Sequence, residues 1–243
     1  MTATAFEFRN RSLIITAIFV LGFSLYAFGD RNLLEALLRW LGRWPGIPQE
    51  TVARVALWLG ALLALSCAII RTWAAAYLDT QVVHDRKLHS ARLVADGPYR
   101  RVRNPLYLGT VLLSLGFVPL TSRFGAPVLV VGILTFVDRL IRREEAELLR
   151  TQGDAFRAYS DAVPRLLPSL VPRVPCSGDK PLWLRALLGE AMMWGFFAAL
   201  AGFAWTLSAR VYGFAMAFAL VSSAAVKAAV WRKPRVDAAG AEP

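Results

Sequence analysis

The sequence is poor in cysteine and histidine, and this scarcity excludes several classes of protein. Its 243 residues include two cysteines and two histidines. Cys67 and Cys176 do not make the disulfide framework of a small secreted domain. Two histidines are too few for a multi-histidine metal centre, so we predict no metal site. A convincing G-x-G-x-x-G segment is also missing, so a Rossmann-type cofactor loop is not expected.

Acidic residues are few as well, with 17 against 28 basic ones, and the net charge is +11. We exclude nucleic acid as the partner, because the basic residues are distributed by membrane topology. Twenty of the 28 lie in residues 9–11, 78–105, 139–181 and 227–243, which lie between, outside or at the ends of the apolar runs. The positive-inside rule then predicts that these regions and both termini are cytoplasmic.

Hydrophobic residues, by contrast, are abundant at 56%, and the mean hydropathy is +0.46. Most of the six long apolar segments approach the ~20 residues that cross a bilayer as a helix. They are residues 12–29, 52–78, 106–121, 125–141, 182–207 and 211–231. The first resembles a signal peptide, but the five that follow favour a retained helix. We therefore predict an all-α integral membrane protein with about six transmembrane helices and the lipid bilayer as its surroundings.

Four regions follow from this pattern. Residues 1–80 hold N-terminal membrane helices and an interfacial amphipathic helix near residues 33–41, where leucines recur at helical spacing. Residues 81–175 form a polar core with a helical hairpin whose link is Ser122-Arg123-Phe124. A helix is expected to continue from Arg142 to Tyr159, and four prolines after it favour an extended path. Residues 176–232 form a helix pair, and 233–243 a disordered tail.

Several charges fall inside the apolar segments, and Glu190 and Arg71 lie well within them. An intramembrane acid such as Glu190 is a functional hypothesis, but Arg185 is near enough in sequence to pair with it instead. Arg71 approaches a cytoplasmic helix end, where its guanidinium is expected to snorkel towards water.

Residues 97–109 carry the densest polar pattern. Asn104 followed by proline predicts a capped helix start, which can bind an anion but often binds nothing. Gly97 and Pro98 add a turn, and the Tyr99 ring could pack on an adenine or anchor the interface. Further on, Glu144 and Glu145 either belong to a solvated helix with local ion pairs or supply a carboxylate for a positively charged sulfur.

Taken in order, these motifs resemble a known family. Leu93-Val94, Gly97-Pro98-Tyr99, Arg103-Asn104-Pro105-x-Tyr107-x-Gly109, Glu144-Glu145-x-x-Leu148 and Val163-Pro164-Arg165 resemble the isoprenylcysteine carboxyl methyltransferase superfamily, which includes phospholipid N-methyltransferases. The resemblance covers about residues 81–170 and implies S-adenosylmethionine as cofactor. The positions it assigns to cofactor binding are His84, Ala91, Arg92, Leu93, Val94, Gly97, Pro98, Tyr99, Arg103, Asn104, Pro105, Leu106, Tyr107 and Glu144.

Two positions depart from the family pattern. The family usually has histidine where this chain has Asn104, which keeps a donor and an acceptor but does not titrate. Eukaryotic prenyl-cysteine enzymes have a substrate-contacting arginine where this chain has Leu140, and Arg139 and Arg142 flank that position.

The function predicted is methyl transfer from S-adenosylmethionine to a lipophilic acceptor, which is a carboxylate, amine or thiol. The site would face the cytoplasm, in a bacterial inner membrane. Arg139 or Arg142 would orient an anionic acceptor, and Glu145 or His84 would handle a proton. The alternatives are a sterol-type membrane reductase that uses NADPH and a non-catalytic scaffold or lipid-binding protein. The sequence is silent on the acceptor and on the oligomeric state.

Overall fold

The computed structural model describes the chain except for residues 1, 30, 44–45, 47, 86–94 and 231–243, and it describes the backbone alone at 79–85, 227 and 229–230. All regular elements in the described part are helices, which confirms the all-α prediction. They are α1 Ala5–Arg9, α2 Arg11–Ser24, η1 Leu25–Phe28, α3 Leu33–Leu41, α4 Gln49–Asp85, η2 Gly97–Arg100, α5 Pro105–Phe117, η3 Val118–Leu120, α6 Gly125–Gln152, α7 Asp154–Ala162, α8 Trp183–Gly189, α9 Ala191–Thr206 and α10 Ala209–Val230.

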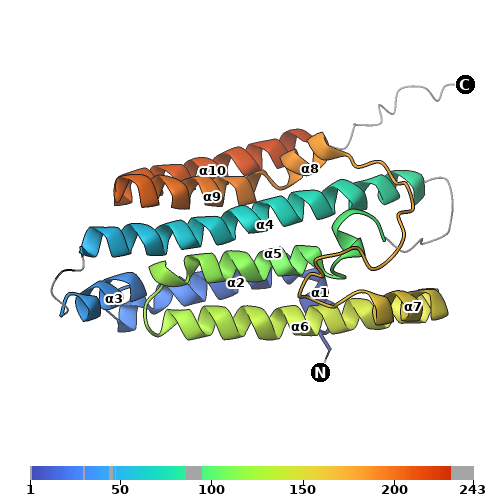
Figure 1. Cartoon of the computed structure of the whole chain (residues 1–243), viewed down its shortest axis with the longest axis horizontal. Helices are drawn as coiled ribbons and strands as arrows, with labels where there is room; N and C mark the ends of the chain where they lie inside the picture. The colour runs from blue at the N-terminus through green and yellow to red at the C-terminus, as the bar shows by residue number, and fades with distance from the viewer. Residues whose placement is uncertain (1, 30, 44–45, 47, 86–94, 231–243) are drawn as a thin grey trace, which may run out of the picture.

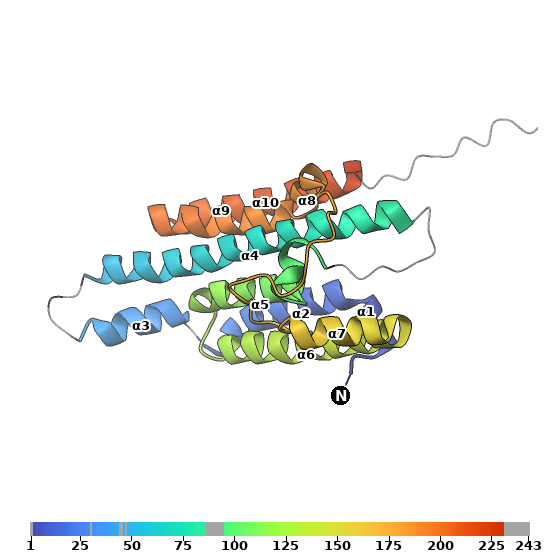
Figure 2. The ribbon, with the colours of Figure 1, turned by 45° about the vertical axis from the view of Figure 1, so that its right-hand side comes forward.

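The long helix α4 is the centre of the molecule. It packs against α5 on one side and α9 on the other, while α10 packs on α9 and α2 on α6 (Figure 1). The same order is seen after a turn of the view (Figure 2). Both α1 and the last turn of α10 lie towards the end of the bundle where α5 begins (Figure 1).

All six predicted apolar segments are helical, but they differ in their fitness to span a membrane. Within the described residues, three segments are long and apolar enough: Arg11–Phe28, Gln49–Leu78 and Ala209–Val226. A fourth is added if α8 and α9, which meet at a bend of 62°, count as one span. Pro105–Leu120 is a shorter apolar helix. A membrane-spanning bundle is thus supported, and the number six stays a prediction.

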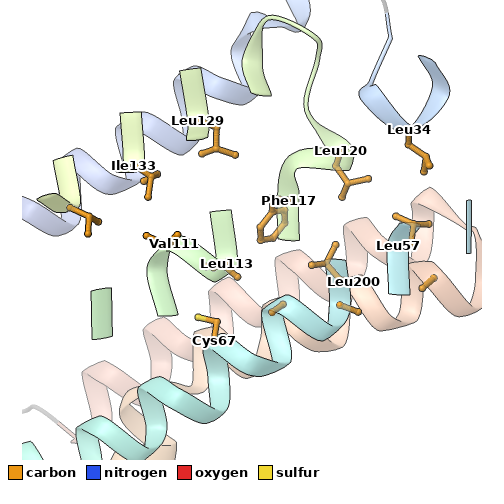
Figure 3. Packing of buried hydrophobic residues seen from close by; sticks show 14 of the residues in the cluster. Leu34, Leu57, Cys67, Val111, Leu113, Phe117, Leu120, Leu129, Ile133 and Leu200 are labelled. Atoms are coloured by element: carbon orange, nitrogen blue, oxygen red, sulfur yellow. The ribbon is translucent and has the colours of Figure 1, made fainter. Parts of the chain in front are cut away.

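Small residues and interlocking aliphatic side chains hold the bundle together. A Cβ added at Gly60 of α4 would lie 2.6 Å from the Gly116 carbonyl oxygen of α5, so these two backbones touch. Around this crossing, one buried cluster joins α4, α5, α6 and α9 (Figure 3). The Phe117 ring in it is edge-on to the ring of Phe196. The close approach fixes α5 against α4, and α5 carries part of the polar site.

Three local predictions can be compared with the structure. The amphipathic helix is α3, and its N-cap Asn32 accepts a hydrogen bond from the Glu35 N–H at 2.7 Å. The hairpin of α5 and α6 is also present. The continuous helix expected over Arg142 to Tyr159 is wrong, because Gly153 takes a φ of 55°, which a glycine adopts readily, and separates α6 from α7.

Residues 163–175, which we call the proline strap, run without a helix from α7 towards α8, as the four prolines predicted (Figure 1). Main-chain hydrogen bonds hold the strap against the segment before α5. The Arg103 N–H donates to the Pro164 carbonyl at 2.9 Å, and the Ser169 N–H donates to the Arg101 carbonyl at 2.9 Å. The strap therefore covers the start of α5.

Candidate functional site

A carboxylate of α6 and a hydroxyl of α5 meet at the centre of the site. The Tyr107 hydroxyl donates to Oε1 of Glu144 at 2.8 Å. Burial raises the pKa of the Glu144 carboxyl above its ordinary value, although the bond from Tyr107 and the charge of Arg11 act in the opposite direction. Within the described part of the chain, no lysine or arginine forms an ion pair with Glu144. A carboxylate of this kind can accept a cationic ligand.

Tyr99, the aromatic residue of the turn before α5, is buried. The Tyr159 hydroxyl of α7 donates to the Tyr99 carbonyl at 2.8 Å, which ties η2 to α7. Burial also raises the pKa of Tyr99 far above its ordinary value, so its hydroxyl stays protonated. Gly97 before it has a φ of 59°, and an added Cβ would lie 2.4 Å from the Tyr77 ring. Glycine is therefore needed at the turn that sets the Tyr99 position.

Asn104 occupies the N-cap position of α5, as predicted, but its side chain does not cap the helix. Its amide instead donates to the Arg165 carbonyl at 3.0 Å and to Oε1 of Glu145 at 3.4 Å. The capping prediction is wrong because the strap and α6 offer acceptors across the site. The family histidine position thus links three segments here.

Glu145 lies in a network of charges. Its Oε2 accepts from Nη2 of Arg165 at 2.9 Å, and Arg103 lies 3.6 Å from its Oε1. Arg165 also reaches Asp138 at 3.1 Å. Proton handling by Glu145 stays a prediction, and the contacts seen are those of a residue that fastens the strap to α6. The role of Arg165 was missed, although it stands in the Val163-Pro164-Arg165 motif.

The two arginines predicted to orient an acceptor both have carboxylate partners. Arg139 pairs with Glu7 of α1 at 2.7 Å, and its buried Nε has no hydrogen-bond partner in the structure described. Arg142 pairs with Asp138 at 2.6 Å on a half-exposed helix face. Leu140 between them is fully buried. Substrate contact by either arginine remains a prediction. The ion pair with Glu7 places α1 beside Arg139.

A second ion pair joins the helix pair after the strap to the site. Nε and Nη2 of Arg71 in α4 bind both oxygens of Glu190 at 2.7 and 2.9 Å. Arg71 also donates to the Leu106 carbonyl of α5 at 3.2 Å. The expectation that Arg71 snorkels is wrong, because packing of α4 against α9 brings a carboxylate to it. The sequence offered Arg185 as the partner of Glu190, and the pairing with Arg71 was not foreseen.

The remaining predicted positions fall into two groups. Pro98, Pro105 and Leu106 lie in η2 and the first turn of α5, beside Tyr99 and Tyr107. The His84 side chain and residues Ala91, Arg92, Leu93 and Val94 lie outside the described residues. The structure thus brings together Tyr99, Asn104, Tyr107, Glu144 and Glu145. The predicted cofactor positions 91–94 are not among the residues that it describes.

These features define a class of protein. Apolar helices long enough for a bilayer support one polar site, built from a helix start, two tyrosines and a mostly buried glutamate. Comparison with known proteins gives a family match over part of the chain. Residues 55–152 match the sequence profile of the phospholipid methyltransferase family, which confirms the predicted resemblance and supports a membrane methyltransferase.

Two curated proteins are similar to parts of the chain. A Protein-S-isoprenylcysteine O-methyltransferase of Schizosaccharomyces pombe is 33% identical over 94 residues, which are 38% of this chain and 39% of that protein. The Cobalt-zinc-cadmium resistance protein CzcN of Cupriavidus metallidurans is 27% identical over 139 residues, which are 57% of this chain and 58% of that protein. The matched stretches thus cover about two fifths and three fifths of these relatives. No solved structure matches at the same level of significance.

Proposed function

We propose that the chain is an integral-membrane methyltransferase that uses S-adenosylmethionine and methylates a lipophilic acceptor. The observation that carries this proposal is the Glu144 carboxylate, mostly buried, bonded to Tyr107 and without an arginine or lysine partner among the described residues. The family profile at residues 55–152 supports the same reaction class. Neither the sterol-type reductase nor the scaffold alternative is favoured by the relatives.

The residues present suit the cofactor. The carboxylate of Glu144 would accept from its amine or ribose hydroxyls, or lie near its positive sulfur. The first N–H groups of α5, at Leu106 and Tyr107, have no carbonyl of their own helix to bind and can meet a carboxylate. The Tyr99 and Tyr107 rings supply apolar surface. When bound, S-adenosylmethionine would supply an already activated methyl group, which a carboxylate, amine or thiol would accept in line while the sulfonium sulfur leaves as a neutral thioether.

The protein's own contribution is then chiefly to hold two reactants in register, because proximity and orientation account for much of such a rate. The hydrogen bonds from Arg71 to α5 and from Asn104 to the strap fix the two walls of the site. Burial around Tyr99 and Glu144 excludes water from it. We place this site at the cytoplasmic face of a bacterial inner membrane, on the distribution of basic residues. An acceptor dissolved in the bilayer would reach it from between the helices.

Calorimetry of S-adenosylmethionine binding to detergent-purified protein tests the proposal. A hydrogen bond to a charged group contributes about 1.5–3 kcal/mol, so Glu144→Gln should weaken binding by about 10- to 100-fold. Glu147→Gln is the matched control, since Glu147 lies one turn further on α6, exposed and paired with Arg150. Tyr107→Phe should weaken binding less. Equal affinity in the wild type, Glu144→Gln and Tyr107→Phe would refute the site, and no transfer of labelled methyl to a host lipid extract would refute the reaction.

A further inference from the structure

The proline strap exposes large apolar side chains although it lies outside every helix. Leu170 is 94% exposed, Leu167 is 79% exposed and Val171 is 57% exposed. Their neighbour Leu166 points the other way and packs against the main hydrophobic cluster. An apolar group of this kind, rimmed by polar residues, marks a surface that contacts another phase or molecule.

The strap is held in shape before it contacts anything. In addition to the bonds to Arg101 and Arg103, the Arg173 N–H donates to the Arg100 carbonyl at 2.8 Å, and Nε of Arg100 donates to the Val174 carbonyl at 2.9 Å. The Arg101 guanidinium also donates to the Leu170 carbonyl. Because the backbone of the strap is already ordered, binding to another surface does not carry the entropic cost of ordering it.

The depth of the strap in the bundle indicates which phase it meets. Leu166, like Tyr107, packs against the cluster to which Val111 of α5 belongs, and the Ser169 N–H donates to the carbonyl of Arg101, four residues before α5 starts. In both views the strap passes close to the end of the bundle at which α5 begins (Figures 1 and 2). The start of α5 is where an apolar helix meets its polar flank, which is the level of the lipid headgroups.

Charge beside the apolar group completes the pattern. Arg173 is exposed, and its Nε donates to Oγ of Ser169 inside the strap at 2.9 Å. The Arg101 guanidinium lies beside Leu170, since it donates to the Leu170 carbonyl. Apolar side chains flanked by arginines are what a membrane surface with anionic lipids recognises, because the former enter the acyl boundary and the latter bind phosphate.

We propose that residues 167–171 insert into the headgroup–acyl boundary of the leaflet at which α5 begins, and that Arg101 and Arg173 bind anionic headgroups there. The strap then fixes the height of the polar site relative to the lipid surface. This inference concerns membrane contact and does not depend on methyl transfer.

Site-directed fluorescence in proteoliposomes tests it. A bimane label at Leu170→Cys, in a Cys176→Ser background that leaves the buried Cys67, should be quenched by doxyl-labelled lipids and protected from aqueous iodide. Ala158→Cys on the exposed face of α7 is the matched control and should show the reverse. A further Leu167→Asp change should reduce the lipid quenching at position 170. Arg101→Gln with Arg173→Gln should reduce it in vesicles containing phosphatidylglycerol and leave it unchanged in pure phosphatidylcholine.

Each contrary result is decisive. Quenching by iodide at position 170 as strong as at 158 would place the strap in water. Protection from both quenchers would mean that protein covers position 170, which would also overturn the proposal. Lipid quenching that is insensitive to the arginine changes in both vesicle types would overturn the anionic-lipid part of the proposal.

Discussion

Glu144 has an unusual environment for a glutamate, because a mostly buried carboxylate normally has a cationic partner. Ionising the Glu144 carboxyl therefore costs more free energy in the folded protein than in the unfolded chain. Glu145, the next residue, has the opposite surroundings, with Arg165 and Arg103 near it. Two adjacent glutamates are thus separated into a ligand-binding candidate and a structural one by the helix faces that they occupy.

The raised pKa of Glu144 predicts a pH-dependent effect on stability. The stability contributed by the protonated carboxyl is fully present below its unfolded pKa, about 4.3, and is lost as the pH rises through the folded pKa. Glu144→Gln should therefore unfold at the same temperature as the wild type near pH 4 and at a higher one near pH 7. Thermal unfolding in detergent across this range measures the difference. Glu147→Gln should not gain stability with pH, because Arg150 lowers the pKa of Glu147. A gap for Glu144→Gln that shrinks with pH would contradict the assignment.

The Arg71–Glu190 pair predicts a second effect at the residue scale. Removing one partner of a buried pair leaves a bare charge, so Glu190→Leu should destabilise the protein by about 3–5 kcal/mol. The double variant with Arg71→Met should recover most of this loss. Glu50→Gln, which breaks the exposed pair with Arg54, should cost less than about 1 kcal/mol. A double variant no more stable than Glu190→Leu, in chemical unfolding of the detergent-solubilised protein, would show that the pair is not the source of the loss.

At the scale of helices, the crossing of α4 and α5 depends on two glycines without side chains. A Cβ at Gly60 would lie 2.6 Å from the Gly116 carbonyl oxygen, so Gly60→Ala should push the helices apart and cost about 1–3 kcal/mol. Gly213 of α10 has open space around its Cβ position, so Gly213→Ala should leave stability unchanged or raise it slightly. Melting temperatures in detergent compare the two variants. Equal effects would mean that helix propensity, and not the crossing, decides the outcome.

The helices themselves could be predicted from sequence because each long apolar run must satisfy its own backbone hydrogen bonds in lipid. Boundaries set by local chemistry were predicted less well. Gly153 ends α6 where a continuous helix was expected, since a charged amphipathic pattern continues through it. Asn104 follows the capping rule in position but not in hydrogen bonding, because the Arg165 carbonyl, 61 residues away, is the better placed acceptor.

At the scale of the whole molecule, the limit of sequence reasoning is the pairing of distant helices. The order of Tyr99, Tyr107 and Glu144 could be recognised, because a turn, a helix start and a following hairpin are local features. The contact between Arg71 and Glu190 spans 119 residues and exists only because α4 packs on α9. Neither residue's neighbours in sequence indicate it. Residues 91–94, which the resemblance assigns to cofactor binding, lie outside what the structure describes.

The same ion pair bears on how the protein is made. Glu190 stands beyond residues 55–152, the stretch shared with the phospholipid methyltransferases, yet it anchors α4 and α5 of that stretch. During translation Arg71 leaves the ribosome long before its partner. The nascent chain must therefore hold the Arg71 guanidinium without its carboxylate partner until Glu190 follows, although α5 already offers it the Leu106 carbonyl. We therefore expect the contacts of Arg71 to be completed last, so that a quality-control system that detects an unpaired charge would distinguish finished from unfinished chains.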